Sequence, residues 1–104
     1  MKSYRVVFSR SAENDLIESV TWGIETWGEQ AASGWAREFR RALQQMLRSF
    51  PISQPLASES DIFDIEIRQM ILGRYRVLFA VDGNTVNVLH IRGPFSDKPE
   101  GKKR

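Results

Sequence analysis

The chain has 104 residues, no cysteine and one histidine, with a formal net charge of +2 at pH 7. The lack of cysteine excludes a disulfide framework and a thiolate metal site, and one histidine cannot build a histidine-rich zinc site. We therefore expect no metal and no cofactor. No segment approaches the ~18 apolar residues of a membrane span, and the N-terminus lacks a signal-peptide core. The sequence thus predicts a cytoplasmic protein with no membrane partner.

The positive charge is concentrated at the C-terminal end. The last seven residues, KPEGKKR, sum to +3, so the other 97 residues sum to −1. We interpret residues 96–104 as a basic, disordered tail and residues 1–95 as one folded domain. The basic balance is therefore no argument for nucleic-acid binding by itself. Arginines outnumber lysines 11 to 4, and the planar guanidinium suits phosphate, carboxylate or stacked bases.

The N-terminal quarter of the chain predicts a strand followed by a helix. Residues 4–8 alternate as in a short strand with β-branched content. Ser9 or Ser11 can cap the helix that follows, and Gly28 is placed to end it. The apolar face predicted for this helix consists of Ala12, Leu16, Ile17, Val20, Ile24 and Trp27.

A second amphipathic helix is predicted over residues 30–49, directly after the first. Two helices joined by such a short link form an antiparallel hairpin, which must cover a flat surface with its apolar side. Residues 51–60 contain prolines and serines without an apolar period, so we expect a loop there. The buried face predicted for the second helix is Ala32, Trp35, Ala36, Phe39, Leu43, Met46 and Phe50.

Three antiparallel strands are predicted in the remaining sequence, at residues 65–72, 75–81 and 85–92. Gly73 supplies the first turn, and Asp82-Gly83-Asn84 is a strong hairpin signal because Asp and Gly accept positive φ. The predicted order is β-α-α-β-β-β, an α+β domain in which an antiparallel helical hairpin packs on a small antiparallel sheet. The edge taken by the first strand is not specified locally.

Several short motifs occur in a fixed order along the chain. They are Y-x-V-x-F-S at residues 4–9, A-x-x-D-L at 12–16, R-Q at 68–69, Y-R-V-L-F at 75–79 and V-x-V-L-H-x-R at 86–92. Together they resemble the RelE/ParE superfamily of bacterial type II toxins, including plasmid stabilisation toxins, and most closely its ParE-like members. The resemblance covers about the first 93 residues and includes the order of elements.

The resemblance implies a small toxin that is held inactive in a hetero-oligomer with a cognate antitoxin, which wraps around the helices and the sheet. ParE-like members of the superfamily inhibit DNA gyrase and block replication. RelE-like members enter the ribosomal A site and cleave mRNA. Either activity causes growth arrest. The candidates for antitoxin contact are Leu16, Val20, Trp22, Trp35, Phe39 and Phe79.

The two activities require different residues. RNA cleavage by transesterification needs a base, an acid and cations at the phosphate. Arg76 stands where RelE-like strands place an arginine, but residues 93–96 are Gly-Pro-Phe-Ser and lack the closing tyrosine, or His-Tyr pair, of many of the nucleases. The candidates for target contact, whichever target applies, are Arg68, Arg74, Arg76, His90 and Arg92. If the chain is a nuclease, the candidates for catalysis are Arg68, Arg76, His90 and Arg92.

These observations lead to three hypotheses. The first is a toxin that inhibits gyrase by binding, without chemistry of its own. The second is a ribosome-dependent mRNA endoribonuclease centred on Arg76, with His90 as acid or base. The third is a degenerate member that only binds its antitoxin.

Each candidate cation also has a structural alternative. Tyr75 and the alternate residues after it are expected to face the helices, which turns Arg74 and Arg76 toward the other side of the sheet. Arg76 is then either free for a partner or ion-paired with Glu66 or Asp64 on the neighbouring strand. The same two interpretations hold for Arg68.

His90 is expected to share a strand face with Val88 and Arg92, where a packed, hydrogen-bonded histidine is an alternative to a catalytic one. Trp22 lies off the apolar stripe of its helix, so an exposed Trp22 would mark a binding surface.

Overall fold

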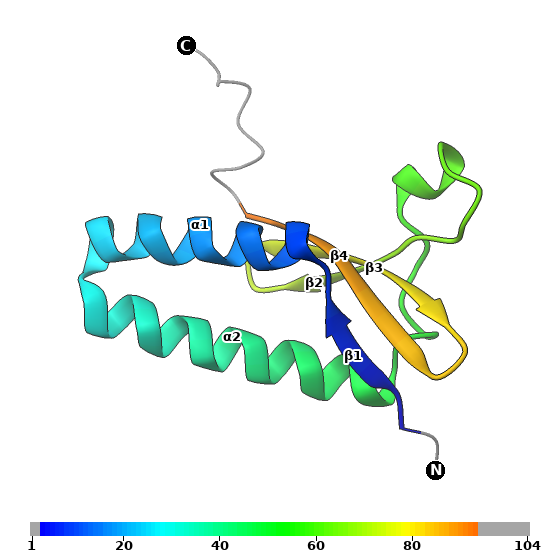
Figure 1. Cartoon of the computed structure of the whole chain (residues 1–104), viewed down its shortest axis with the longest axis horizontal. Coiled ribbons are helices and arrows are strands. Elements are labelled where there is room, and N and C mark those ends of the chain that lie inside the picture. Colours follow the sequence, from blue (N-terminus) through cyan, green and yellow to red (C-terminus); the bar gives the residue numbers. More distant parts are fainter. Residues whose placement is uncertain (1–2, 94–104) are drawn as a thin grey trace.

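The computed structural model describes residues 3–93, which form a helical hairpin packed on one four-stranded sheet (Figure 1). The observed order confirms the predicted β-α-α-β-β-β arrangement. The predicted tail and Phe95 lie outside the described residues. The elements are β1 (Arg5–Phe8), α1 (Arg10–Trp27), α2 (Glu29–Ser49), the 3-10 helix η1 (Ser58–Asp61), β2 (Arg68–Leu72), β3 (Tyr75–Asp82) and β4 (Thr85–Arg92).

The sheet has the strand order β1-β4-β3-β2. β2, β3 and β4 form the predicted antiparallel meander, whereas β1 runs parallel to β4 from Arg5, opposite Thr85, to Phe8, opposite Val88. The sheet is therefore mixed, with β1 at one edge and β2 at the other. This placement puts the start of α1, immediately after β1, beside the C-terminal half of β4.

The hairpin turns at a single residue. Gly28 has a φ of 96°, a left-handed conformation that favours glycine, and it links the end of α1 to the start of α2. At the other end of α1, Ser9 is the N-cap and its Oγ accepts a hydrogen bond from the Ala12 amide at 3.0 Å. In residues 3–93, no helix has the length and hydropathy to cross a membrane.

α1 buries a different stripe from the predicted one. Ile17, Ile24 and Trp27 were expected in the core but are 60%, 41% and 52% exposed. A Cβ atom at Gly23 would lie 3.2 Å from the Cβ of Ala32, so the two helices approach each other through small residues. That close approach, rather than the largest apolar side chains, determines the buried face, which is Ala12, Leu16, Ser19 and Gly23.

α2 follows its predicted face for most of its length and departs from it near the end. Met46 and Phe50, expected to be buried, are 39% and 57% exposed, whereas Leu47 is fully buried. The stripe continues in steps of four residues from Phe39 through Leu43 to Leu47. Phe50 lies beyond the end of the helix, at its C-cap.

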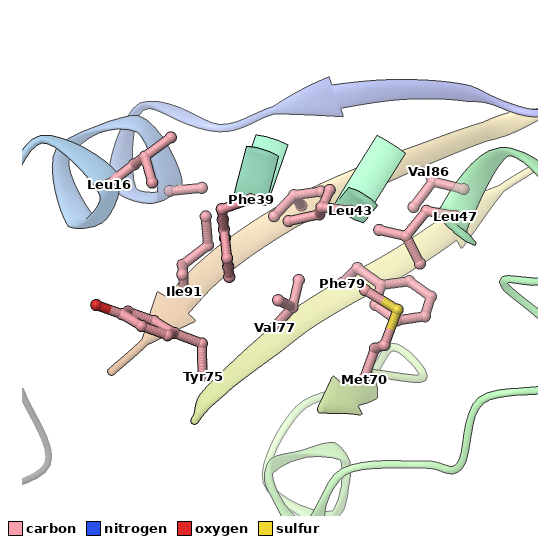
Figure 2. Close-up of a cluster of buried hydrophobic side chains, with 12 residues drawn as sticks. Leu16, Phe39, Leu43, Leu47, Met70, Tyr75, Val77, Phe79, Val86 and Ile91 are labelled. Atoms are coloured by element: carbon pink, nitrogen blue, oxygen red, sulfur yellow. The ribbon is translucent and has the colours of Figure 1, made fainter. Parts of the chain in front are cut away.

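The main core fills the space between the hairpin and the sheet (Figure 2). Phe79, Leu43 and Leu47 are its largest fully buried side chains, and each such burial stabilises the fold by roughly 1.5–3 kcal/mol. A smaller cluster of Ala57, Ile67 and Leu78 lies on the other side of the sheet, which we call the open face. β3 is thus covered on both faces, which explains its nearly continuous apolar sequence.

A register shift interrupts the pairing of β3 and β4. Leu78 is opposite His90, whereas Phe79 is opposite Val88, so Leu89 is an extra residue in β4. The bulge turns His90 to the open face with Leu78, while Val88 packs in the main core. The expectation that His90 and Val88 share a face was therefore wrong, because it assumed unbroken alternation.

Candidate functional site

An aromatic groove lies between the tip of the helical hairpin and the β2–β3 turn. Its volume is about 450 Å³. Trp22 and Trp27 meet edge to face at 5.1 Å between ring centroids, and Trp35 is tilted against Tyr75, also at 5.1 Å. Its lining is mostly apolar, which suits a protein segment or another apolar partner better than a charged one. The lining residues are Trp22, Trp27, Trp35, Glu38, Phe39, Ala42, Leu72, Gly73, Arg74 and Tyr75.

The structure divides the residues predicted for antitoxin contact into two groups. Trp22 is 39% exposed, and Trp35 lines the same aromatic groove. Val20 is half-buried and lines a second groove, between α1 and α2. The remaining three, Leu16, Phe39 and Phe79, are at most 6% exposed and belong to the main core. Periodicity cannot distinguish these groups, since core and interface residues share one apolar pattern.

Arg76 lies on the open face, as expected, but its ion-pair partner is not one of the predicted acids. Its Nη2 contacts Glu59 Oε1 at 2.6 Å and its Nε donates to Gln69 Oε1 at 2.8 Å. Glu59 comes from η1, whereas Glu66 lies before the start of β2 and contacts Arg68. Local register could not reveal this pair because a loop brings η1 over the sheet.

The pair with Arg76 changes the acidity of Glu59. The hydrogen bond from Arg76 holds the pKa of the Glu59 carboxyl below its ordinary value of 4.5. Both side chains are 28% exposed, so the pair is partly shielded from water. Arg76 is thus neutralised by a carboxylate of its own chain.

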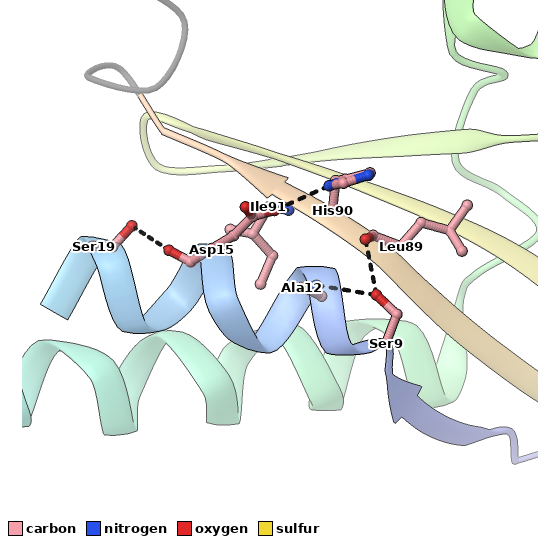
Figure 3. Close-up of polar contacts among 7 residues, drawn as sticks. All are labelled: Ser9, Ala12, Asp15, Ser19, Leu89, His90 and Ile91. Carbon is pink, nitrogen blue, oxygen red and sulfur yellow. Dashed lines mark hydrogen bonds and ion pairs between the residues drawn. The ribbon is translucent and has the colours of Figure 1, made fainter.

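His90 contacts an acid of α1 (Figure 3). Its Nδ1 lies 3.3 Å from Asp15 Oδ2, and the same oxygen accepts a hydrogen bond from the Ile91 amide at 2.8 Å. At the N-cap of α1, Ser9 Oγ donates to the Leu89 carbonyl at 2.9 Å. Side chains at the start of α1 therefore form hydrogen bonds with the part of β4 that extends beyond the end of β1. The hydrogen-bonded interpretation of His90 fits this geometry, but the side chain is 40% exposed and is not packed in the core.

The other two candidate arginines lie elsewhere. Arg68 alternates with Met70 and Leu72, which contact the main core, so it is on the helix side of the sheet. Its Nη1 donates to the Gln54 carbonyl at 2.7 Å, and its Nη2 is 3.5 Å from Glu66. Arg74, expected to face away from the helices, instead lines the aromatic groove from the β2–β3 turn.

The open face thus brings together Arg76, His90 and Arg92 but not Arg68 or Arg74. Arg92 is directly opposite Arg76 in the β3–β4 register, so their side chains are on one face. This arrangement can bind an anionic group. Sequence reasoning missed Glu59, Asp15 and Trp27 as residues that shape these surfaces. The aromatic content of the hairpin was the one available signal for Trp27.

A comparison with protein families gives a match over most of the chain. The profile described as ParE toxin of type II toxin-antitoxin system, parDE, matches residues 6–93. The chain belongs to the ParE toxin family. No curated protein matches it significantly.

Two solved structures share the fold of this ParE-family toxin. One is the chromosomal ParDE toxin-antitoxin system from P. aeruginosa, with a TM-score of 0.70 and 15% identity, covering 88% of this chain and 96% of that chain. The other is the toxin-antitoxin complex RelBE2 from Mycobacterium tuberculosis, with a TM-score of 0.57 and 23% identity, covering 93% and 97%. At these identities the likeness is one of fold.

The motifs by which the chain resembles its family have structural roles in this toxin. Ser9 and Asp15 join the start of α1 to the edge of β4, and the alternate residues of the 75–79 motif fill the core. Fold and motif therefore identify the family without identifying the target.

Proposed function

We propose that this ParE-family toxin inhibits DNA gyrase by binding to it and has no catalytic activity of its own. The observation that supports this proposal is the ion pair of Arg76 with Glu59 at 2.6 Å. A catalytic cation must be available to the developing charge of a transition state, and Arg76 is already neutralised by its own chain. His90 is likewise hydrogen-bonded to Asp15.

A supercoiling assay with purified toxin tests the proposal. We expect gyrase to lose supercoiling activity as the toxin approaches stoichiometric amounts. Relaxation of the same plasmid by a topoisomerase of another type is the control and should be unchanged. Full gyrase activity at a large excess of folded toxin would contradict the proposal.

Ribosome-dependent mRNA cleavage is the second candidate function. It is favoured by one observation, the presence of Arg76, His90 and Arg92 on the same face of the sheet. The test is translation of a reporter mRNA with and without toxin. Translation-coupled cuts that disappear in Arg76→Ala would support cleavage, and intact mRNA would exclude it.

We also propose that a cognate antitoxin neutralises the toxin by covering the aromatic groove. Trp27 is 52% exposed and Trp22 is 39% exposed, and such aromatic side chains often anchor protein interfaces. Two of the solved structures with this fold, the ParDE system and the RelBE2 complex, are toxin-antitoxin assemblies. Toxin and gyrase would meet in the cytoplasm.

Binding of purified antitoxin to groove variants tests this second proposal. Trp27→Ala should weaken binding by about tenfold or more, with little effect on folding because the side chain is half exposed. Ile62→Ala, at a 76% exposed position in the loop before β2, is the matched control. Equal affinities of the two variants would contradict an antitoxin site in the groove.

Induced expression without growth arrest would identify a degenerate toxin.

A further inference from the structure

The loop of residues 50–67 between α2 and β2, which we call the α2–β2 loop, is fastened to the sheet by two arginines. Arg76 of β3 contacts Glu59 at 2.6 Å, and Arg68 of β2 donates to the Gln54 carbonyl at 2.7 Å. A surface loop that is tied down in this way loses little conformational entropy when a partner binds to it. The outward side chains of the loop are therefore presented in a fixed arrangement.

The same loop carries a large share of the exposed apolar side chains. Within residues 3–93, six of the thirteen large apolar side chains that are exposed lie in residues 50–65. Ile62, Phe63 and Ile65 are 76%, 56% and 54% exposed. Apolar side chains gathered in water in this way are typical of a surface that another protein covers.

A groove beside the loop adds a free strand edge to these side chains. β2 begins at Arg68, opposite Phe79, so in the described part of the chain residues 80–82 of β3 have no strand neighbour on that side. The groove has a volume of about 500 Å³, and its lining includes Ile52 and Ile65 from the loop and residues 80–82. An extended segment of a partner can pair with such an edge and place its side chains against the loop.

The charge of the loop indicates the kind of partner. Residues 49–67 contain four acids and neither lysine nor arginine. Glu59 and Glu66 are paired with arginines of the sheet, whereas Asp61 and Asp64 form no ion pair within residues 3–93. The loop therefore suits a partner that is both apolar and cationic. A second copy of this chain would bring like charges together at the same surface, which is unfavourable.

We propose that the α2–β2 loop docks on DNA gyrase, with Ile62, Phe63 and Ile65 as the apolar contacts and with Asp61 and Asp64 facing a cationic segment of the enzyme. The inference rests on the proposed function and assigns a surface to it. An enzyme that acts on DNA carries cationic surfaces for the phosphates, and these match the acids of the loop. The arginines of β2 and β3 then act by holding the loop rather than by contacting the target.

The surface proposed for gyrase is separate from the one proposed for the antitoxin. The aromatic groove includes Tyr75 at the start of β3, whereas the groove beside the α2–β2 loop includes Asp82 at its end. In Figure 1, η1 and the tip of the helical hairpin lie at opposite ends of the molecule. Substitutions in the loop can therefore be tested for gyrase binding without a direct effect on the antitoxin site.

Binding of purified gyrase to fluorescently labelled toxin, measured beside the supercoiling assay, tests the apolar contacts. The double variant Ile62→Ala with Phe63→Ala should raise the dissociation constant and the half-inhibitory concentration by about tenfold or more. Its unfolding temperature and its affinity for antitoxin should equal those of the wild type, because both side chains are exposed. The matched control is Ile17→Ala with Ile24→Ala, which truncates side chains of α1 that are 60% and 41% exposed. The control should bind gyrase as the wild type does.

The double variant Asp61→Asn with Asp64→Asn tests the charge and nearly preserves the shape of the loop. It should weaken gyrase binding several-fold at low ionic strength and reduce the salt dependence of the dissociation constant. Glu18→Gln with Glu25→Gln is its control, because it removes the same charge from exposed positions of α1. Equal weakening in the two double variants would reduce the effect to net charge and overturn the inference.

The outcomes separate this inference from gyrase inhibition itself. Losses confined to the two variants of the α2–β2 loop support it. If the wild type inhibits gyrase and both loop variants inhibit it equally well, the docking surface lies elsewhere and only this inference is overturned. Equal losses in the apolar loop variant and its α1 control would also overturn it. Wild-type toxin that leaves gyrase fully active would overturn both proposals.

Discussion

Single side chains join the helical hairpin to the last strand of this toxin. Asp15 is 26% exposed and contacts both His90 and the Ile91 amide, at the place where β1 has ended and β4 has lost its neighbour. Its carboxylate therefore replaces a missing strand partner. Asp15 of the early motif and His90 of the late motif therefore meet at this place.

We expect Asp15→Ala to lower the free energy of unfolding by about 2 kcal/mol, because the Ile91 amide loses its acceptor in a partly buried position. Urea denaturation measures the change. Glu18→Ala, at an exposed acidic position of the same helix, should change stability by less than about 0.5 kcal/mol. Similar losses for the two variants would indicate a general effect of charge on the helix.

The Glu59 carboxyl predicts a pH dependence of stability. Its pKa is lowered in the folded protein from the ordinary value of 4.5, so its contribution is complete above that value and is lost as the pH falls through the folded pKa. The stability difference between wild type and Glu59→Gln should therefore be constant near neutral pH and shrink below about pH 4.5. Urea denaturation across this range measures it, and a difference that grows toward acid would contradict the assignment.

At the scale of elements, two glycines inside the helices have opposite surroundings. A Cβ atom at Gly34 in α2 would lie no closer than 3.9 Å to another atom, whereas one at Gly23 in α1 would lie 3.2 Å from Ala32 and 3.3 Å from Trp27. A Cβ atom could therefore be added at Gly34 without a clash, whereas Gly23 is part of the contact between α1 and α2.

Gly34→Ala should stabilise the protein by roughly 0.5–1 kcal/mol, because alanine restricts the unfolded chain and favours the helix. Gly23→Ala should show no such gain, since the helices must separate to admit the methyl group. Thermal unfolding of both variants beside the wild type decides this. A gain of the same size at both positions would mean that the hairpin contact is not tight.

For the whole molecule, one core couples the hairpin to the sheet. Leu43 from α2 and Phe79 from β3 are both fully buried in it. Neither layer can keep its apolar face covered without the other, so we expect them to unfold together.

Far-UV circular dichroism and tryptophan fluorescence should therefore give the same unfolding midpoint, although the tryptophans lie only in the hairpin. Leu43→Ala should lower the free energy of unfolding by about 3 kcal/mol and shift both signals equally. Leu56→Ala, at a 51% exposed position, is the control and should change it by less than about 0.5 kcal/mol. Separate transitions would show that the hairpin folds on its own.

Features that depend on neighbours along the chain could be predicted from the sequence. Apolar periods, the Ser9 cap and the glycines at 28, 73 and 83 predicted the helices, strands and turns, and the ordered motifs predicted the family. Contacts between side chains from distant parts of the chain became visible in the folded structure alone. The bulge at Leu89 reversed the face of His90, η1 brought Glu59 to Arg76, and small residues in the hairpin left Trp27 exposed. These outcomes depend on packing between distant segments, and no local pattern encodes them.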